Sequence, residues 1–168
     1  TPELAEKHPQ FLAEIDGKRT AGRNYQICTS ASGVAEFFAE RLAEVVKRFP
    51  HLELFAITQA DGTRWCQCAQ CAAKDSGAQW RRIGDDEDQR ASYPVVTERW
   101  IEFVNQVVAR LSEQFPKQRF YTLAYNQTQT PPAKADCRPH PHLTITLTHK
   151  GCFTHSFERV GCAPNAEW

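Results

Sequence analysis

The sequence predicts an α/β fold, in which parallel strands alternate with amphipathic helices. Two long segments carry apolar residues at spacings of three and four, the pattern of a helix with one buried face. A run of strand-forming residues follows each of these segments within a few positions. Because a helix between two strands carries the chain back to the same end of the sheet, the strands that it joins run parallel. The predicted order is βαβαβ followed by one more strand.

The two strong helices have clear ends in the sequence. The first follows Ser32, whose hydroxyl suits an N-cap, and stops at Pro50. The second opens near Pro94, a residue favoured in the first helical turn, and stops before Pro116. A weaker helical pattern covers residues 2–15 and ends at an Asp-Gly pair. Four segments are predicted to be strands: residues 25–29, 52–58, 119–125 and 143–148.

Length, composition and charge predict a single globular domain covering residues 1–168. A chain of 168 residues suffices for one core, and 41% hydrophobic with 24% charged residues is typical of soluble proteins. The 20 basic residues balance the 20 acidic ones, and no apolar run is long enough to span a bilayer. We therefore expect a soluble domain with no nucleic-acid and no membrane partner. Because the chain starts at Thr1 and contains no methionine, we expect it to be part of a larger polypeptide.

The loops after the strands are the expected working face. Ligands of parallel sheets collect at the carboxyl ends of the strands, where these loops meet. The loop of residues 59–93 is far longer than the usual connection of about 2 to 6 residues. Residues 126–142 contain four prolines and no helical period, so they are expected to be an extended loop. The shorter loops to search are residues 30–33 and 149–155.

A cluster of cysteines is the most distinctive feature of the long loop. Cys66, Cys68 and Cys71 place three sulfurs within a few positions, enough for three ligands of a tetrahedral Zn²⁺ site. The fourth ligand is expected from the last loop, from Cys152 or alternatively from His155, because neighbouring strand ends converge. Two other interpretations stay open: a disulfide within the cluster with one free thiol, or three reduced cysteines. The isolated cysteines have no predicted role: Cys28, Cys137 and Cys162.

Polar and aromatic residues near this cluster suggest a carbohydrate site. Asp61 follows the second strand, where a barrel enzyme places a catalytic carboxylate, although the Asp-Gly pair is equally explained as a turn. Aromatic faces beside amide groups suit a sugar, whose ring offers apolar C–H faces and a rim of hydroxyl groups. The candidate sugar-binding residues lie at the ends of the second and third strands and in the long loop: Gln59, Trp65, Tyr125, Asn126 and Gln127.

Several segments resemble a bacterial family classified as a domain of unknown function. They are HPQFLAEIDGKR (8–19), QICTS (26–30), TQADGTRWCQCAQC (58–71), FVNQVVARL (103–111), TLAY (122–125) and GCFTHSF (151–157). That family resembles TIM-barrel glycosidases of the α-glucuronidase and β-hexosaminidase kind, often in exported proteins. The resemblance implies a (β/α)₈-type barrel acting on polysaccharide in a secreted or periplasmic protein. Because a complete barrel needs about 250 residues, the four predicted strands imply a partial barrel.

Two functions follow from these expectations. In the first, the domain is glycoside hydrolase-like, with Asp61 as an acid/base or orienting carboxylate. The second catalytic group then comes from the rest of the polypeptide or from an N-acetyl group of the substrate. In the second function, the domain is a non-catalytic carbohydrate-binding or scaffold domain, whose cysteine cluster staples the long loop through Zn²⁺ or a disulfide. A redox or metal-handling role is disfavoured, because low-pKa cysteines need nearby positive charge and only Arg64 is close in sequence.

Overall fold

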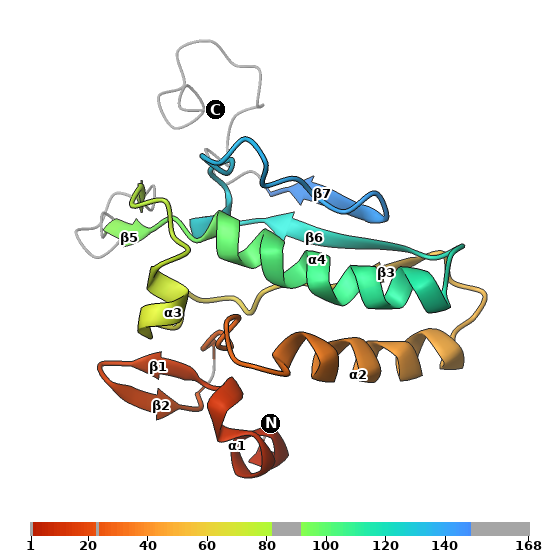
Figure 1. Ribbon diagram of the computed structural model, residues 1–168, viewed down its shortest axis with the longest axis horizontal. Helices are drawn as coiled ribbons and strands as arrows, with labels where there is room; N and C mark the ends of the chain where they lie inside the picture. The colour runs from red at the N-terminus through yellow and green to blue at the C-terminus, as the bar shows by residue number, and fades with distance from the viewer. Residues whose placement is uncertain (1, 23, 82–91, 149–168) are drawn as a thin grey trace, which may run out of the picture.

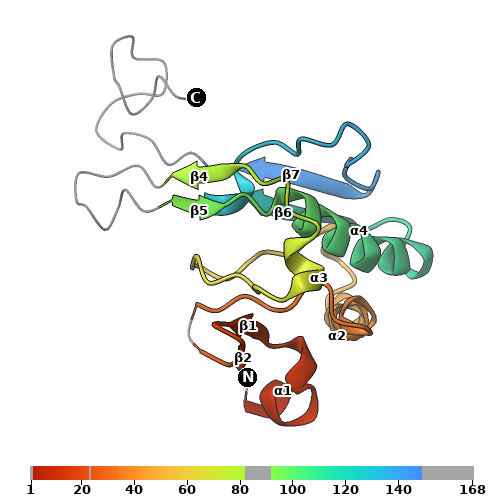
Figure 2. The ribbon, with the colours of Figure 1, turned by 60° about the vertical axis from the view of Figure 1, so that its left-hand side comes forward.

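The computed structural model describes residues 2–22, 24–81 and 92–148, which form helices and small sheets around a parallel sheet (Figures 1 and 2). The helices are α1 (Pro2–Lys7), α2 (Val34–Arg48), α3 (Ala69–Ala72) and α4 (Thr97–Gln114), with two 3-10 helices, η1 (Pro9–Phe11) and η3 (Asn126–Thr128). The strands are β1 (Ala13–Ile15), β2 (Lys18–Thr20), β3 (Leu54–Ala56), β4 (Gln79–Arg81), β5 (Ser92–Pro94), β6 (Arg119–Ala124) and β7 (Leu143–Leu147). The predicted α/β class is confirmed.

The central sheet has three parallel strands in the order β3-β6-β7. Phe55 of β3 lies opposite Phe120 of β6, and Thr122 of β6 lies opposite Ile145 of β7. The connection from β3 to β6 contains α4, whereas residues 126–142 return the chain to β7 without an α-helix. Two antiparallel hairpins, β1–β2 and β4–β5, are separate from this sheet. The described residues therefore form a parallel α/β unit and not a complete barrel.

Helix α4 lies between the sheet and α2, so its apolar residues form the centre of the main core (Figures 1 and 2). Phe103, Val107 and Leu111 of α4 are almost fully buried. The indole Nε1 of Trp100 donates to Thr122 Oγ1 at 2.9 Å, which satisfies two polar groups inside this core. None of the described helices combines the length and the apolar composition needed to cross a membrane.

Two predicted elements differ from the structure. Only the first part of residues 2–15 is helical, because Asp16 and Gly17 do not end a helix but form the turn of the hairpin β1–β2. Both have positive φ, 50° and 75°, the backbone geometry of a tight hairpin turn. The predicted strand at residues 25–29 forms only isolated bridges, through Tyr25 and Ile27. Within the described residues it is not a strand of the β3-β6-β7 sheet, and Tyr25 instead forms a parallel bridge with Arg64.

Candidate metal centre

Four cysteines from separate parts of the chain meet in a small second core beside the hairpin β1–β2. Cys28 precedes α2, Cys66 lies in the loop after β3, Cys68 is the residue before α3, and Cys71 lies within α3. Their Sγ atoms all lie within 4.8 Å of one another, and none of the four residues is more than 8% exposed. These buried cysteines are positioned to bind a metal ion.

The separations of the sulfur atoms fit a tetrahedral thiolate site. Cys28 Sγ lies 3.7 Å from Cys68 Sγ and 3.8 Å from Cys71 Sγ. Zn–S bonds of about 2.3 Å at tetrahedral angles place the ligand sulfurs about 3.8 Å apart. A disulfide needs about 2.05 Å, and all five cysteines within the described ranges are unpaired. Among the described residues the clustered sulfurs are therefore unpaired and spaced as metal ligands would be.

The short helix α3 brings two of the sulfurs to the same side. Cys68 precedes the helix with an extended backbone (φ −60°, ψ 152°), and Cys71 follows three residues later inside it. The backbone N–H of Ala72 donates to Cys68 O at 3.0 Å and closes the turn. Residues three apart in a helical turn share a face. The Cys-x-x-Cys spacing therefore directs both sulfurs toward Cys28.

Hydrogen-bond donors surround the sulfurs. The backbone N–H of Glu14, in β1, donates to Cys66 Sγ at 3.3 Å, and Arg19 Nη1, in β2, lies 3.6 Å from the same sulfur. The Cys71 thiol donates to the hydroxyl oxygen of Ser30 at 3.3 Å. The two donors to Cys66 are of the kind that stabilises thiolates and orients metal ligands. The hairpin β1–β2 therefore supplies donors to Cys66 Sγ, although it lies far from the cysteine trio in the sequence.

A buried arginine adds positive charge next to the cluster. Arg99, in the first turn of α4, is 2% exposed, and its Nη1 donates to Cys66 O at 2.7 Å. Its guanidinium carbon lies 5.6 Å from the centre of the Trp65 ring. Its Nε lies 3.0 Å from Asp75 Oδ1, an ion pair without the alignment of a hydrogen bond. Since four thiolates outweigh the charge of a divalent cation, Arg99 and Arg19 would partly offset the excess negative charge if the site held such an ion.

Cys66 and Cys71 hold their thiol protons unequally. Hydrogen bonds with Cys28 and then Cys66 lower the pKa of the Cys71 thiol, and the contact with Ser30 lowers it further. Hydrogen bonds with Cys28 and then Cys71, together with burial, raise the pKa of the Cys66 thiol. Cys71 is therefore the first of these sulfurs to become a thiolate. A metal ion binds thiolates and displaces the remaining protons, so its affinity rises with pH.

The predicted carboxylate Asp61 contacts the predicted sugar ligand Tyr125. Asp61 follows β3 and Tyr125 follows β6, and the Tyr125 hydroxyl donates to Asp61 Oδ1 at 2.6 Å. Asp61 is exposed and Tyr125 is half-buried. Because β3 and β6 are parallel neighbours, their carboxyl ends lie at the same edge of the sheet. That edge brings the two side chains together.

The other predicted sugar-binding side chains are engaged within the fold. Gln59 Nε2 donates to Thr128 Oγ1 at 2.8 Å, and the Trp65 ring packs edge-on against Trp100. Gln127 Nε2 donates to a backbone carbonyl oxygen at 3.0 Å. Three of these predicted ligands are buried: Trp65, Asn126 and Gln127. Gln59, Trp65 and Gln127 make these contacts with other residues of the protein. Their role in sugar binding stays a prediction.

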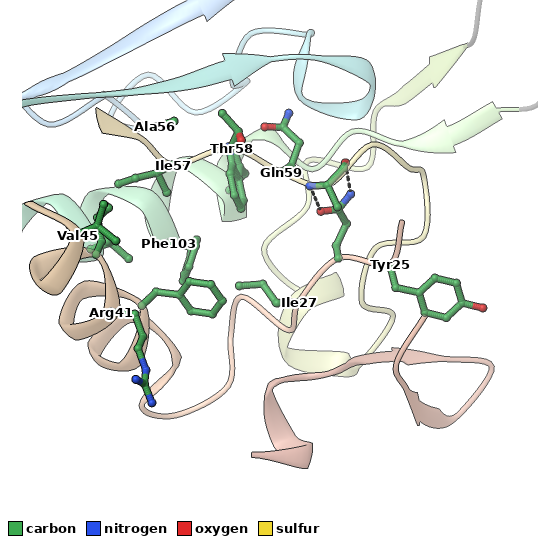
Figure 3. A pocket seen from close by; sticks show the side chains of 15 residues that line it. Tyr25, Ile27, Arg41, Val45, Ala56, Ile57, Thr58, Gln59 and Phe103 are labelled. Carbon is green, nitrogen blue, oxygen red and sulfur yellow. Dashed lines mark hydrogen bonds between the residues drawn. The ribbon is translucent and has the colours of Figure 1, made fainter. Parts of the chain in front are cut away.

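A pocket of about 450 Å³ opens beside this edge, between α2, α4 and the end of β3 (Figure 3). Its walls are largely apolar and include Ile27, Val45, Ile57 and Phe103. Gln59 brings an amide group to the same pocket. The residues just before Asp61, Gln59 and Ala60, line this pocket, although Asp61 itself does not.

The residues of the cluster and of the strand edge lie within one family match. A family model described as Domain of unknown function (DUF4838) matches residues 2–162. The chain belongs to the DUF4838 family. A search of the curated proteins and a search of the solved structures gave no match. The DUF4838 match includes all four clustered cysteines as well as Asp61 and Tyr125.

The sequence identified three of the four sulfurs in this DUF4838 domain. Cys152 and His155, the predicted sources of the fourth ligand, lie outside the described residues. Within them, Cys28 completes the set of four and occupies the position for which Cys152 was predicted. Cys28 lies at the end of the predicted strand 25–29, and the convergence of strand ends applies to it as well as to Cys152. That signal in the sequence could have identified it.

Proposed function

We propose that this domain is a zinc-stapled, glycoside hydrolase-like domain that acts on or binds polysaccharide at the strand edge carrying Asp61 and Tyr125. The observation that carries the proposal is the hydrogen bond of 2.6 Å between the Tyr125 hydroxyl and Asp61 Oδ1. It supplies an oriented carboxylate and an aromatic ring at the carboxyl ends of two parallel strands, the usual position of a ligand site in such sheets.

Zinc is the metal that best suits the cluster. Four thiolates with tetrahedral spacing favour Zn²⁺ or iron among the common metals, and Zn²⁺ is the usual occupant of structural four-cysteine sites. The four sulfurs leave no open coordination position, so the ion has a structural role and does not activate water. It would hold the start of α3 and the Cys66 segment against Cys28, which lies between the hairpin β1–β2 and α2.

The carbohydrate role rests on what Asp61 and Tyr125 can do together. An exposed carboxylate that accepts one hydrogen bond from a phenol keeps its other lone pairs for sugar hydroxyl groups. The same carboxylate could serve as an acid/base or orienting group in glycoside hydrolysis, which uses a pair of catalytic groups. The second group would come from the rest of the polypeptide or from an N-acetyl group of the substrate.

Hydrolysis and binding assays with the polypeptide that carries this domain test the proposal. Acetylated and uronic-acid-containing glycans are the first substrates, and Asp61→Asn and Tyr125→Phe are the test variants. Glu113→Gln is the matched control, because Glu113 is an exposed carboxylate at the far end of α4. We expect Asp61→Asn to abolish turnover while Glu113→Gln retains it. If no variant shows turnover but Asp61→Asn weakens glycan binding, the result supports the non-catalytic form. If Asp61→Asn changes neither turnover nor binding, the proposal is refuted.

A further inference from the structure

The Asp61 loop is held by a residue close to the metal cluster. We propose that Gln26 is a positioning residue that couples metal binding at Cys28 to the orientation of Asp61. The inference rests on the proposed role of Asp61, and it concerns how that carboxylate is kept in place. The sequence does not distinguish Gln26 from the other glutamines. Its hydrogen bonds in the folded chain do.

The Gln26 side chain forms hydrogen bonds with the backbone on both sides of Asp61. Its Oε1 accepts from the N–H of Ala60 at 3.0 Å, and its Nε2 donates to Ala60 O at 2.7 Å and to Gly62 O at 3.1 Å. Gln26 is only 6% exposed, so water does not compete freely for these bonds. One side chain therefore holds the backbone of Ala60 and Gly62, the residues on either side of Asp61.

The backbone of residues 24–28 also lies in close contact with that of residues 60–66. The N–H of Gln26 donates to Arg64 O at 3.0 Å, and Arg64 Nη1 donates to the Tyr25 hydroxyl at 3.0 Å. A Cβ atom on Gly62 would lie 2.2 Å from the carbonyl oxygen of Asn24, a distance that no side chain can occupy. Residues 24–28 and 60–66 thus run side by side, and their register depends on close contact.

The metal cluster joins the same two segments two residues further on. Cys28 belongs to the first segment and Cys66 to the second, and both are among the four clustered cysteines. A bound ion would link them by two metal–sulfur bonds, whereas in its absence the link consists of weak thiol contacts. Release of the ion would therefore loosen the cysteine end of the paired segments and leave the hydrogen bonds of Gln26 and Arg64 to hold their register. Gln26 would then be less firmly aligned with the Asp61 loop, and Asp61 would be less firmly held beside Tyr125.

The test compares Zn²⁺ affinity and the environment of Asp61 in the whole chain, without any carbohydrate. Gln26→Leu is the test variant, and Asn105→Leu is its matched control. The amide group of Asn105 likewise holds a loop by two hydrogen bonds to its backbone: Nδ2 donates to Arg138 O at 2.8 Å, and Oδ1 accepts from the N–H of His140 at 2.8 Å. Coupling is reciprocal, so a residue that transmits metal binding to the loop must also affect metal affinity.

We expect Gln26→Leu to lower the Zn²⁺ affinity by about tenfold and Asn105→Leu to leave it unchanged. In the zinc-loaded Gln26→Leu protein, the side-chain carboxyl ¹³C resonance of Asp61 should move toward its position in metal-free wild type. If the metal-free wild type unfolds, the reference becomes loaded Tyr125→Phe, which lacks the same hydrogen bond. An unchanged Zn²⁺ affinity, or an Asp61 resonance unaffected by Gln26→Leu, would overturn the inference. Failure of the carbohydrate assays alone would leave this coupling intact and refute only the proposed function.

Discussion

Replacement of Cys28 by serine tests the least expected member of the metal cluster. Cys28 is 1% exposed, and its sulfur lies 3.7 and 3.8 Å from two other sulfurs of the set. Structural zinc sites contribute about 10–16 kcal/mol, so one of four ligands accounts for about 3 kcal/mol, or roughly a 100-fold change in affinity. Serine keeps the size of the side chain but replaces a soft thiolate with a hydroxyl that rarely binds zinc. We expect Cys28→Ser to lower Zn²⁺ affinity by that factor.

Competition with a chromogenic zinc chelator at neutral pH measures this affinity. Cys137→Ser provides the control, because Cys137 is half-buried and outside the cluster. Cys152→Ser discriminates between the two candidates for the fourth ligand, and we expect it to bind Zn²⁺ as tightly as wild type. Equal affinities for wild type and Cys28→Ser, with a large loss in Cys152→Ser, would refute the assignment of Cys28.

Three further substitutions test the packing and charge around the site. Gly62→Ala should destabilise the fold by about 1–3 kcal/mol in chemical denaturation, because its methyl group would meet the carbonyl of Asn24 at 2.2 Å; wild-type stability would contradict this. Burial raises the pKa of Asp75 from 3.8 to about 6, so the native state keeps a proton that the unfolded chain loses in this range. Stability should therefore fall by up to about 3 kcal/mol as pH rises from about 4 to above 6, and Asp75→Asn should lack this component. Identical pH profiles for the two proteins would exclude it. Thr122→Val leaves the buried indole N–H of Trp100 without its acceptor and should cost about 1–3 kcal/mol, whereas Thr122→Ser should cost less; equal losses would contradict the hydrogen bond.

The helices and most of the sheet could be predicted because their patterns are local. The amphipathic stripes and the prolines that follow them predicted α2 and α4, although Gly33 and not Ser32 is the N-cap of α2, and Pro94 ends β5 before α4 begins at Thr97. The hairpin β1–β2 was missed because an Asp-Gly pair is compatible with both a helix end and a tight turn. The structure shows the hairpin turn, and its strand β1 also contacts Cys66, a residue far away in the sequence.

The candidate site was predicted in part for the same reason. Cys66, Cys68 and Cys71 are close in sequence, so their spacing indicates a metal, whereas Cys28 joins them only through the fold. Polar residues at strand ends were expected to face a ligand. Gln127, one of these residues, donates to a backbone carbonyl oxygen inside the protein, and its part in ligand binding stays a prediction. Residue type alone cannot distinguish an amide that binds a ligand from one that binds the backbone.

Zinc K-edge X-ray absorption of the purified chain tests the central claim most directly. If Cys28 and the cysteine trio hold one ion, the spectrum will show a single shell of four sulfur scatterers at about 2.3 Å. A first shell that contains nitrogen or oxygen, or a protein that binds no zinc with its thiols reduced, would contradict the claim that these four buried cysteines form a structural metal centre.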